Sequence, residues 1–121
     1  MLKARLDSFR YALKGIADLF RHTPNARIHL FITCCVVIAG FFFGITRIEW
    51  CVIILCIALV FAAEAANTAI EYLTDLVSPE YHQLAGKTKD AAAAAVLLAA
   101  IGAAITGIII FVPYLVEIID F

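Results

Sequence analysis

The sequence predicts an all-α integral membrane protein with three transmembrane helices and an N-terminal amphipathic helix. Its 121 residues are 64% apolar and their mean hydropathy is +1.00, well above the values of soluble domains. Three apolar runs are long enough to cross a bilayer, which takes about 20 residues in a helix. Before them, residues 2–21 have apolar side chains at helical spacing.

The first expected element is a helix over residues 2–21. Leu6, Phe9 and Leu13 recur at spacings of three and four residues, while lysine and arginine residues occupy the other faces. A basic amphipathic helix of this kind is suited to lying in the membrane interface, with its apolar face toward lipid. Packing of the same face on the protein's own bundle is an open alternative.

The expected transmembrane helices cover residues 28–46, 50–77 and 91–112. Ser78 and Pro79 end the second helix, because proline lacks an amide hydrogen and disfavours helix in the residue before it. Residues 78–90 are expected to form a loop, and Pro113 to mark the outer end of the third helix. This last helix is rich in alanine and glycine, which allow transmembrane helices to approach closely.

The basic residues predict the orientation. Eight of the nine lysines and arginines precede the first span or lie in the 78–90 segment, and only Arg47 lies in the remaining turn. The positive-inside rule therefore places the N-terminus and the 78–90 segment in the cytoplasm. The formal net charge of −1 says nothing by itself about partners, and no nucleic-acid partner is expected for this membrane protein.

A polar stripe follows one side of the second span. Its members fall within about 100° of one another around a helix, and they are Glu64, Asn67, Thr68, Glu71 and Asp75. A charge facing lipid costs at least about 2.5–3.5 kcal/mol. We therefore expect the stripe to face a protein interior or a water-filled pocket.

The depths of these residues indicate a chemistry. Glu71 is expected near the headgroups, and Glu64 lies two turns, about 10 Å, deeper, where a carboxylate suits a general base acting on a lipid hydroxyl. Glu71 suits Mg²⁺, which prefers oxygen ligands and substrate phosphates. Lys89 can neutralise phosphate charge, and Asp90 is expected at the start of the third helix, where the dipole favours an acidic residue. Together these are the parts of a phosphoryl transfer site.

Other interpretations remain open from the residues alone. Buried carboxylates also serve an oligomeric ion or proton transport subunit, and polar stripes also hold helices together in a pure assembly protein. His29, at the mouth of the first span, suits a metal or phosphate contact or a hydrogen-bonded boundary residue. The four cysteines lack the spacing of zinc or redox motifs.

The motif EAANTAIE at 64–71, followed by Asp75 and by EYHQLAGKTKDAAAAAV at 80–96, resembles the signature of the prokaryotic diacylglycerol kinase family. The similarity covers nearly the whole chain. It implies a single membrane lipid kinase domain over residues 1–121, a homotrimer in the bacterial inner (cytoplasmic) membrane, and a lipid alcohol as acceptor. It also implies ATP as phosphoryl donor and Mg²⁺ as cofactor.

The resemblance implies a role for each matching residue. Glu64 corresponds to the catalytic carboxylate that takes the proton of the lipid hydroxyl, and Glu71 to a carboxylate that binds Mg²⁺ and reaches the nucleotide. Asn67 and Asp75 correspond to supporting positions. Further nucleotide contacts are implied at Tyr11, Glu80, Tyr81, His82, Lys89 and Asp90.

Several segments are more similar to the undecaprenol kinase branch of this family. They are RIH at 27–29, IEW at 48–50, the alanine run after Asp90 and IIFVPYL at 109–115. We therefore expect undecaprenol as the acceptor, with diacylglycerol as the alternative. The diacylglycerol kinase branch has a second metal-binding glutamate at the start of the first span, where this chain has His29. The implied metal ligands are thus Glu71 and, as an open alternative, His29.

Overall fold

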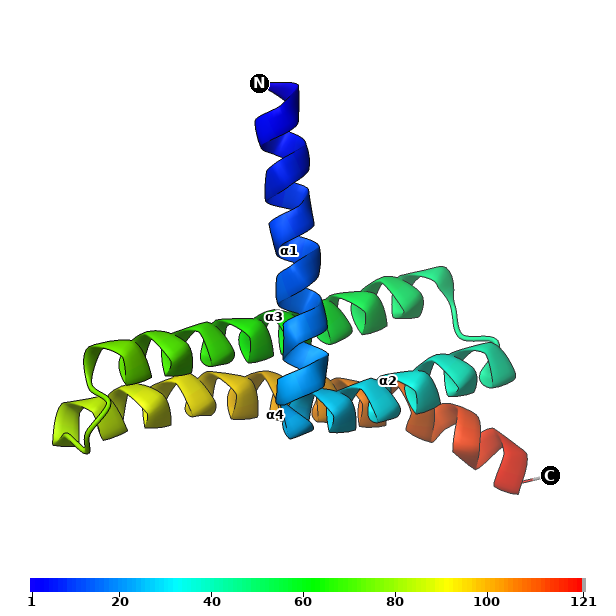
Figure 1. Cartoon of the computed structure of the whole chain (residues 1–121). Helices are drawn as coiled ribbons and strands as arrows, with labels where there is room; N and C mark the ends of the chain where they lie inside the picture. Colours follow the sequence, from blue (N-terminus) through cyan, green and yellow to red (C-terminus); the bar gives the residue numbers. More distant parts are fainter. Residues whose placement is uncertain (121) are drawn as a thin grey trace.

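The structure, a computed structural model, describes residues 1–120. Within this range the chain forms four helices and no strand, and the helices are α1 (Leu2–His22), α2 (Pro24–Phe43), α3 (Arg47–Val77) and α4 (Gln83–Ile119). Helices α2, α3 and α4 lie alongside one another and are long and apolar enough to cross a membrane, whereas α1 projects across their direction (Figure 1). The predicted all-α fold with three candidate membrane spans is confirmed.

The chain changes direction between α1 and α2. Thr23 has an extended backbone and Pro24 begins α2, a helix position that suits proline because no amide hydrogen is needed there. Arg27 caps the C-terminal end of α1. Its Nε donates to the carbonyl of Phe20 at 2.7 Å, and its Nη2 donates to the carbonyl of Arg21. The last carbonyls of α1 are thus satisfied by a cation, which also suits the helix dipole.

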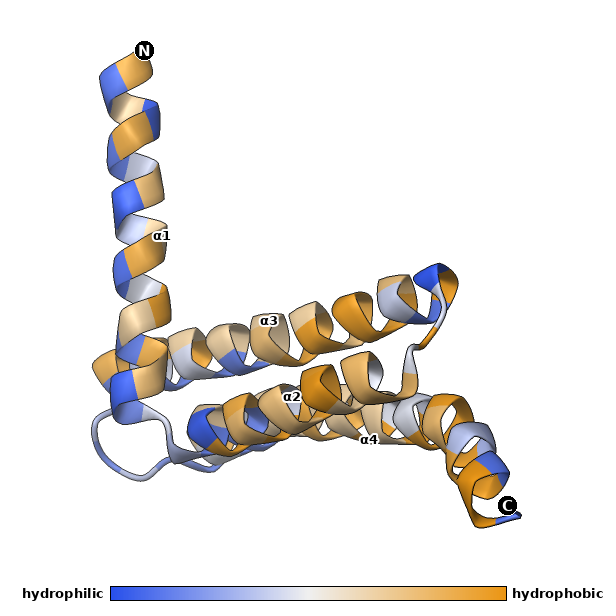
Figure 2. Cartoon of the chain, turned by 90° about the vertical axis from the view of Figure 1, so that its right-hand side faces the viewer, coloured by the Kyte–Doolittle hydropathy of each residue, from blue (hydrophilic) through white to orange (hydrophobic). Residues whose placement is uncertain are grey.

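Only the C-terminal end of α1 packs on the bundle. Phe20 makes an edge-to-face contact with Phe61, with ring centroids 5.5 Å apart, and the hydroxyl of Tyr72 donates to Asp18 at 2.7 Å. The rest of α1 is exposed on its apolar and basic sides alike. Figure 2 shows this mixture of hydrophobic and hydrophilic residues along α1, in contrast to the mainly hydrophobic α2.

Helices α3 and α4 extend past the beginning of α2. The hydroxyl oxygens of Thr23 and Thr68 are 3.4 Å apart, so α2 begins level with Thr68. Because α2 has 20 residues, it is about 30 Å long, which is the thickness of the hydrocarbon layer. From Thr68, α3 continues to Val77, which is about 14 Å further at 1.5 Å per residue. The α3–α4 hairpin therefore projects beyond the thickness that α2 can span.

The prediction of a loop over residues 78–90 is wrong in its second half. Helix α4 begins at Gln83, because the Nδ1 atom of His82 accepts a hydrogen bond from the Leu84 amide at 3.1 Å and caps the helix. Asp90 is consequently the eighth residue of α4, about two turns from the N-terminus of the helix. The expected dipole interaction of Asp90 is therefore not formed.

Helices α2 and α3 also differ from the expected bounds, at the turn that connects them. Helix α2 ends at Phe43 rather than at residue 46, because Gly44 adopts a left-handed conformation with φ of 62°. Thr46 and Glu49 then form a capping box that starts α3. Gly40 lies against the Trp50 ring, so closely that a Cβ atom at this position would clash with it.

Helix α4 does not end at the expected proline. It continues through Pro113 to Ile119, although proline cannot donate the usual helical hydrogen bond and disturbs the preceding turn. The C-terminal part of α4, red in Figure 1, turns away from the other helices. Beside it, the Tyr114 hydroxyl donates to Glu49 at 2.6 Å and ties α4 to the start of α3.

Candidate active site

Glu64 is the most buried polar side chain on α3, with 1% of its surface exposed. Within residues 1–120, neither of its carboxylate oxygens has a hydrogen-bond partner. His29 on α2 lies beside it, with its Nε2 3.3 Å from Oε1 of Glu64. Buried polar groups in native proteins normally have partners, so an isolated carboxylate here is a candidate for contact with a ligand.

Asn67 and Glu71 continue the stripe toward the end of α3. Asn67 is 8% exposed, and its Nδ2 donates to Oε1 of Glu71 at 3.2 Å. The Oδ1 atom of Asn67 is buried and has no partner in the part of the chain that the structure covers. This segment therefore presents oxygen atoms from an amide, one turn from Glu64, and from a carboxylate, two turns from Glu64.

Asp75 and Lys89 meet across the α3–α4 hairpin. The Nζ atom of Lys89 contacts Oδ1 of Asp75, and both side chains are partly exposed. This ion pair connects the polar end of α3 to α4, in the part of the α3–α4 hairpin that extends past the beginning of α2. An exposed pair of this kind adds only about 0–1 kcal/mol to stability, so Lys89 can leave Asp75 for a more highly charged ligand.

Not every sequence-predicted residue joins this group within one chain. Glu80 and Tyr81 are exposed in the loop between α3 and α4, where His82 caps a helix. Tyr11 is 66% exposed in the middle of α1, where Lys14 lies over its ring. Helix α1, which carries Tyr11, projects away from the bundle that contains Glu64 (Figure 1).

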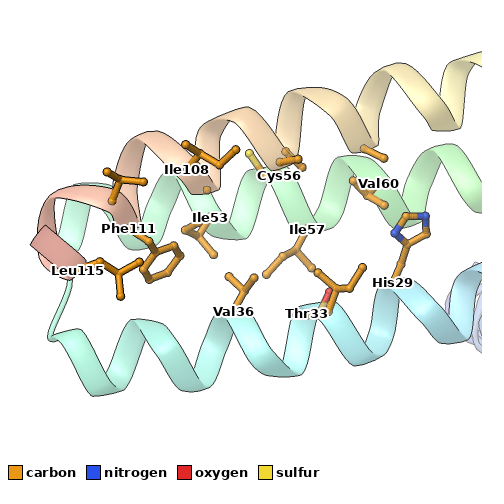
Figure 3. Close-up of a pocket in the computed structure, with 16 residues that line it drawn as sticks. His29, Thr33, Val36, Ile53, Cys56, Ile57, Val60, Ile108, Phe111 and Leu115 are labelled. Carbon is orange, nitrogen blue, oxygen red and sulfur yellow. The ribbon is translucent and has the colours of Figure 1, made fainter. Parts of the chain in front are cut away.

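An apolar groove begins at His29 and follows the bundle toward its other end. Its volume is about 570 Å³, and it lies between α2 and α4 with α3 as its floor (Figure 3). His29 and Val60 lie at one end and Phe111 and Leu115 at the other. Almost all of the lining is hydrophobic, so the groove suits a long apolar ligand with one polar end near Glu64.

This groove is not predicted by the sequence. Its lining comes from three helices and includes small residues of α4, Ala100, Ala103, Ala104 and Gly107. The alanine and glycine content of the third span was the available signal, and it was interpreted as close helix packing. A second cavity of about 500 Å³, beside the α3–α4 loop and lined in part by Thr74, Ser78 and His82, was also not foreseen.

The polar stripe on α3 has oxygen atoms of the kind that coordinate a hard cation. Within residues 1–120, no three His, Cys, Asp or Glu side chains converge on one point. Even so, the unpartnered Oδ1 of Asn67 and the carboxylate of Glu71 are oxygen donors in one place. Mg²⁺ binds through one or two carboxylates and completes its shell with water and substrate phosphates. The residues present fit that pattern.

The fold and the site together define a class of protein. A buried carboxylate lies between an apolar groove and a polar group, which runs from the buried amide of Asn67 to the exposed Asp75–Lys89 pair, in a bundle long enough to cross a membrane. This arrangement suits an enzyme that binds a lipid and a phosphate compound next to each other and catalyses a reaction between them. The chain belongs to the prokaryotic diacylglycerol kinase family, which matches residues 10–111.

Three relatives illustrate the range of similarity. The chain is 42% identical over 108 residues to an undecaprenol kinase of Bacillus subtilis, which covers 89% of this chain and 88% of the relative. It is also 42% identical over 114 residues to a diacylglycerol kinase of Synechocystis, covering 93% of this chain and 65% of that protein. A diacylglycerol kinase of Haemophilus influenzae is 34% identical over 94 residues, covering 78% of this chain and 80% of the relative.

Family membership establishes the type of reaction. The protein is a membrane lipid kinase, a phosphotransferase that moves a phosphoryl group from ATP to an alcohol acceptor. The predicted enzyme class is therefore confirmed.

Proposed function

We propose that the protein phosphorylates undecaprenol to undecaprenyl phosphate in the bacterial inner membrane, with Glu64 as the general base. The similarity to the undecaprenol kinase of Bacillus subtilis, which extends over most of both chains, supports this acceptor. One observation carries the site assignment: the unpartnered carboxylate of Glu64 lies beside His29, where the apolar groove ends.

The proposed reaction places the two substrates on opposite sides of Glu64. The prenyl chain occupies the groove, and its hydroxyl faces Glu64. The hydroxyl oxygen forms a bond to the γ-phosphorus while the bond from this phosphorus to the β–γ bridging oxygen breaks. The electron pair of the broken bond leaves with ADP, and the hydroxyl proton moves to Glu64. Holding a lipid and a water-soluble substrate in line supplies much of the rate.

The nucleotide binds on the cytosolic side of Glu64 in this proposal. Glu71, with Asn67 beside it, would hold Mg²⁺, which neutralises phosphate charge when bound. Lys89 exchanges its contact with Asp75 for a phosphate oxygen, and Asp75 keeps Lys89 near the site when nucleotide is absent. The remaining proposed nucleotide contacts are Tyr11, Glu80, Tyr81, His82 and Asp90.

The proposal includes a homotrimer in which each site is completed by a neighbouring subunit. Many large apolar side chains of the single chain are exposed along α2, α3 and α4, and lipid or other subunits must cover them. Helix α1, which carries Tyr11, projects away from the bundle (Figure 1), so Tyr11 requires such a neighbour to reach a nucleotide. The whole chain acts as one domain, with the N-terminus and the α3–α4 loop in the cytoplasm and α1 in the interface.

A direct comparison of acceptors tests the proposed substrate. Purified protein in mixed micelles is supplied with radiolabelled ATP and with undecaprenol and diacylglycerol at equal mole fractions. We expect undecaprenol to have the higher kcat/KM, because a single groove fits one chain better than two. A higher kcat/KM for diacylglycerol would overturn the acceptor assignment, but the assignment as a lipid kinase would stand.

Narrowing the groove tests where the acceptor binds. Ala103→Leu adds bulk to the groove lining, whereas Ala95→Leu makes the same change at an exposed position of α4 outside the groove. A misfit of this size in an apolar pocket costs about 1–3 kcal/mol, so we expect KM for undecaprenol to rise at least about tenfold in Ala103→Leu. KM for ATP should not change. Equal acceptor KM values in the two variants would exclude the groove as the acceptor site.

A further inference from the structure

His29 occupies the junction between the carboxylate and the groove. It lies in the second turn of α2, its side chain is 21% exposed, and its Nε2 is 3.3 Å from Oε1 of Glu64. The same imidazole lines the polar end of the apolar groove, as Figure 3 shows. It therefore touches both the carboxylate and the space in which an acceptor chain would lie.

Within residues 1–120, Glu64 has no hydrogen-bond partner that would fix its orientation. Within the described range, its two oxygens are otherwise without partners, and a glutamate carboxylate rotates readily about its last side-chain torsion. The contact between Nε2 of His29 and Oε1, which are 3.3 Å apart, restricts this rotation. The second oxygen, Oε2, is buried and has no hydrogen-bond partner within residues 1–120, so it is the atom left for an acceptor hydroxyl.

A role for His29 as a metal ligand fits the structure less well. The oxygen donors suited to Mg²⁺ belong to Asn67 and Glu71, which lie further along α3 toward the cytosolic end and contact each other. His29 contacts the deeper Glu64 and faces the groove instead. No described group of three His, Cys, Asp or Glu side chains includes it.

We infer that His29 is a positioning residue, which holds Glu64 through Oε1 so that Oε2 meets the hydroxyl of the lipid acceptor. This inference rests on the proposed role of Glu64 as the base. It assigns His29 to the transfer step, and it separates the two contacts that Glu64 makes: one to the protein and one to the substrate.

The test compares three replacements of His29 in the full-length protein. His29→Leu removes the donor, His29→Asn keeps polarity but is too short to reach Glu64, and His29→Gln has an amide N–H at about the distance of Nε2. Because misplacing a reacting group by about 1 Å can cost about 100-fold, we expect kcat to fall by about 100-fold in the Leu and Asn variants. His29→Gln should recover at least about tenfold of this loss.

Other readouts separate positioning from metal binding and from structure. KM for ATP and the Mg²⁺ concentration for half-maximal rate should stay within about twofold of wild type in all three variants. The control is His22→Leu, at an exposed histidine that contacts Asp18 and not Glu64, and it should retain wild-type kcat.

Three results would overturn the inference. They are wild-type kcat in His29→Leu, a raised Mg²⁺ requirement in the His29 variants, and a loss in His29→Gln as large as in His29→Asn with matching losses of thermal stability. If His29→Leu does not assemble, the Gln and Asn pair decides alone. A fully active Glu64→Gln enzyme would instead remove the base assignment, independently of these outcomes.

Discussion

Replacing Glu64 by glutamine is expected to lower kcat for lipid phosphorylation by about 100- to 10,000-fold, the contribution typical of a general base. Glutamine has nearly the same shape and fills the same buried space, but its amide cannot take the proton of the acceptor hydroxyl. The groove and the Asn67–Glu71 pair are unchanged by this substitution, so the binding of both substrates should persist. Turnover of undecaprenol and titration of nucleotide binding measure the two effects separately.

The matched control for this variant is Glu117→Gln, which neutralises an exposed carboxylate near the C-terminal end of α4. It should have wild-type activity, because Glu117 lies far along the bundle from Glu64. Near-normal turnover in Glu64→Gln would contradict the base assignment. Loss of nucleotide binding together with turnover would show that Glu64 belongs to the nucleotide site instead.

The second large effect is expected for Glu71→Gln. The new side chain can still accept a hydrogen bond from Nδ2 of Asn67, so the local structure should be kept, but the negative charge opposite Mg²⁺ is lost. Losing a charge-assisted contact costs about 1.5–3 kcal/mol, which corresponds to at least about tenfold in affinity. The Mg²⁺ concentration for half-maximal activity should rise accordingly, and excess Mg²⁺ should restore part of the rate.

Lys89→Gln provides the contrast to Glu71→Gln. It should weaken ATP binding at every Mg²⁺ concentration, because Lys89 is proposed to contact phosphate directly, and excess Mg²⁺ should not restore it. Rates are measured over a grid of ATP and Mg²⁺ concentrations. An unchanged Mg²⁺ requirement in Glu71→Gln would argue against its role as the metal ligand, whatever the result for Lys89.

The sequence predicted the helices and the polar stripe because these depend on local rules. In lipid, every backbone amide and carbonyl must be bonded within its segment, so an apolar run of about 20 residues has little choice but a helix. Carboxylates that recur at helical spacing must share one face, and Glu64 is buried as that argument requires. Helix ends were less predictable: His82 and Gly44 changed them through a side-chain cap and a left-handed turn.

The relations between helices could be decided only by the tertiary structure. The contact of His29 with Glu64, the ion pair of Asp75 with Lys89 and the groove all join residues from different helices. Helical periodicity gives the face on which a side chain lies, but the depth and rotation at which two helices meet depend on how their side chains interlock. The sequence alone therefore determined which residues share a face, and packing determined which of them meet.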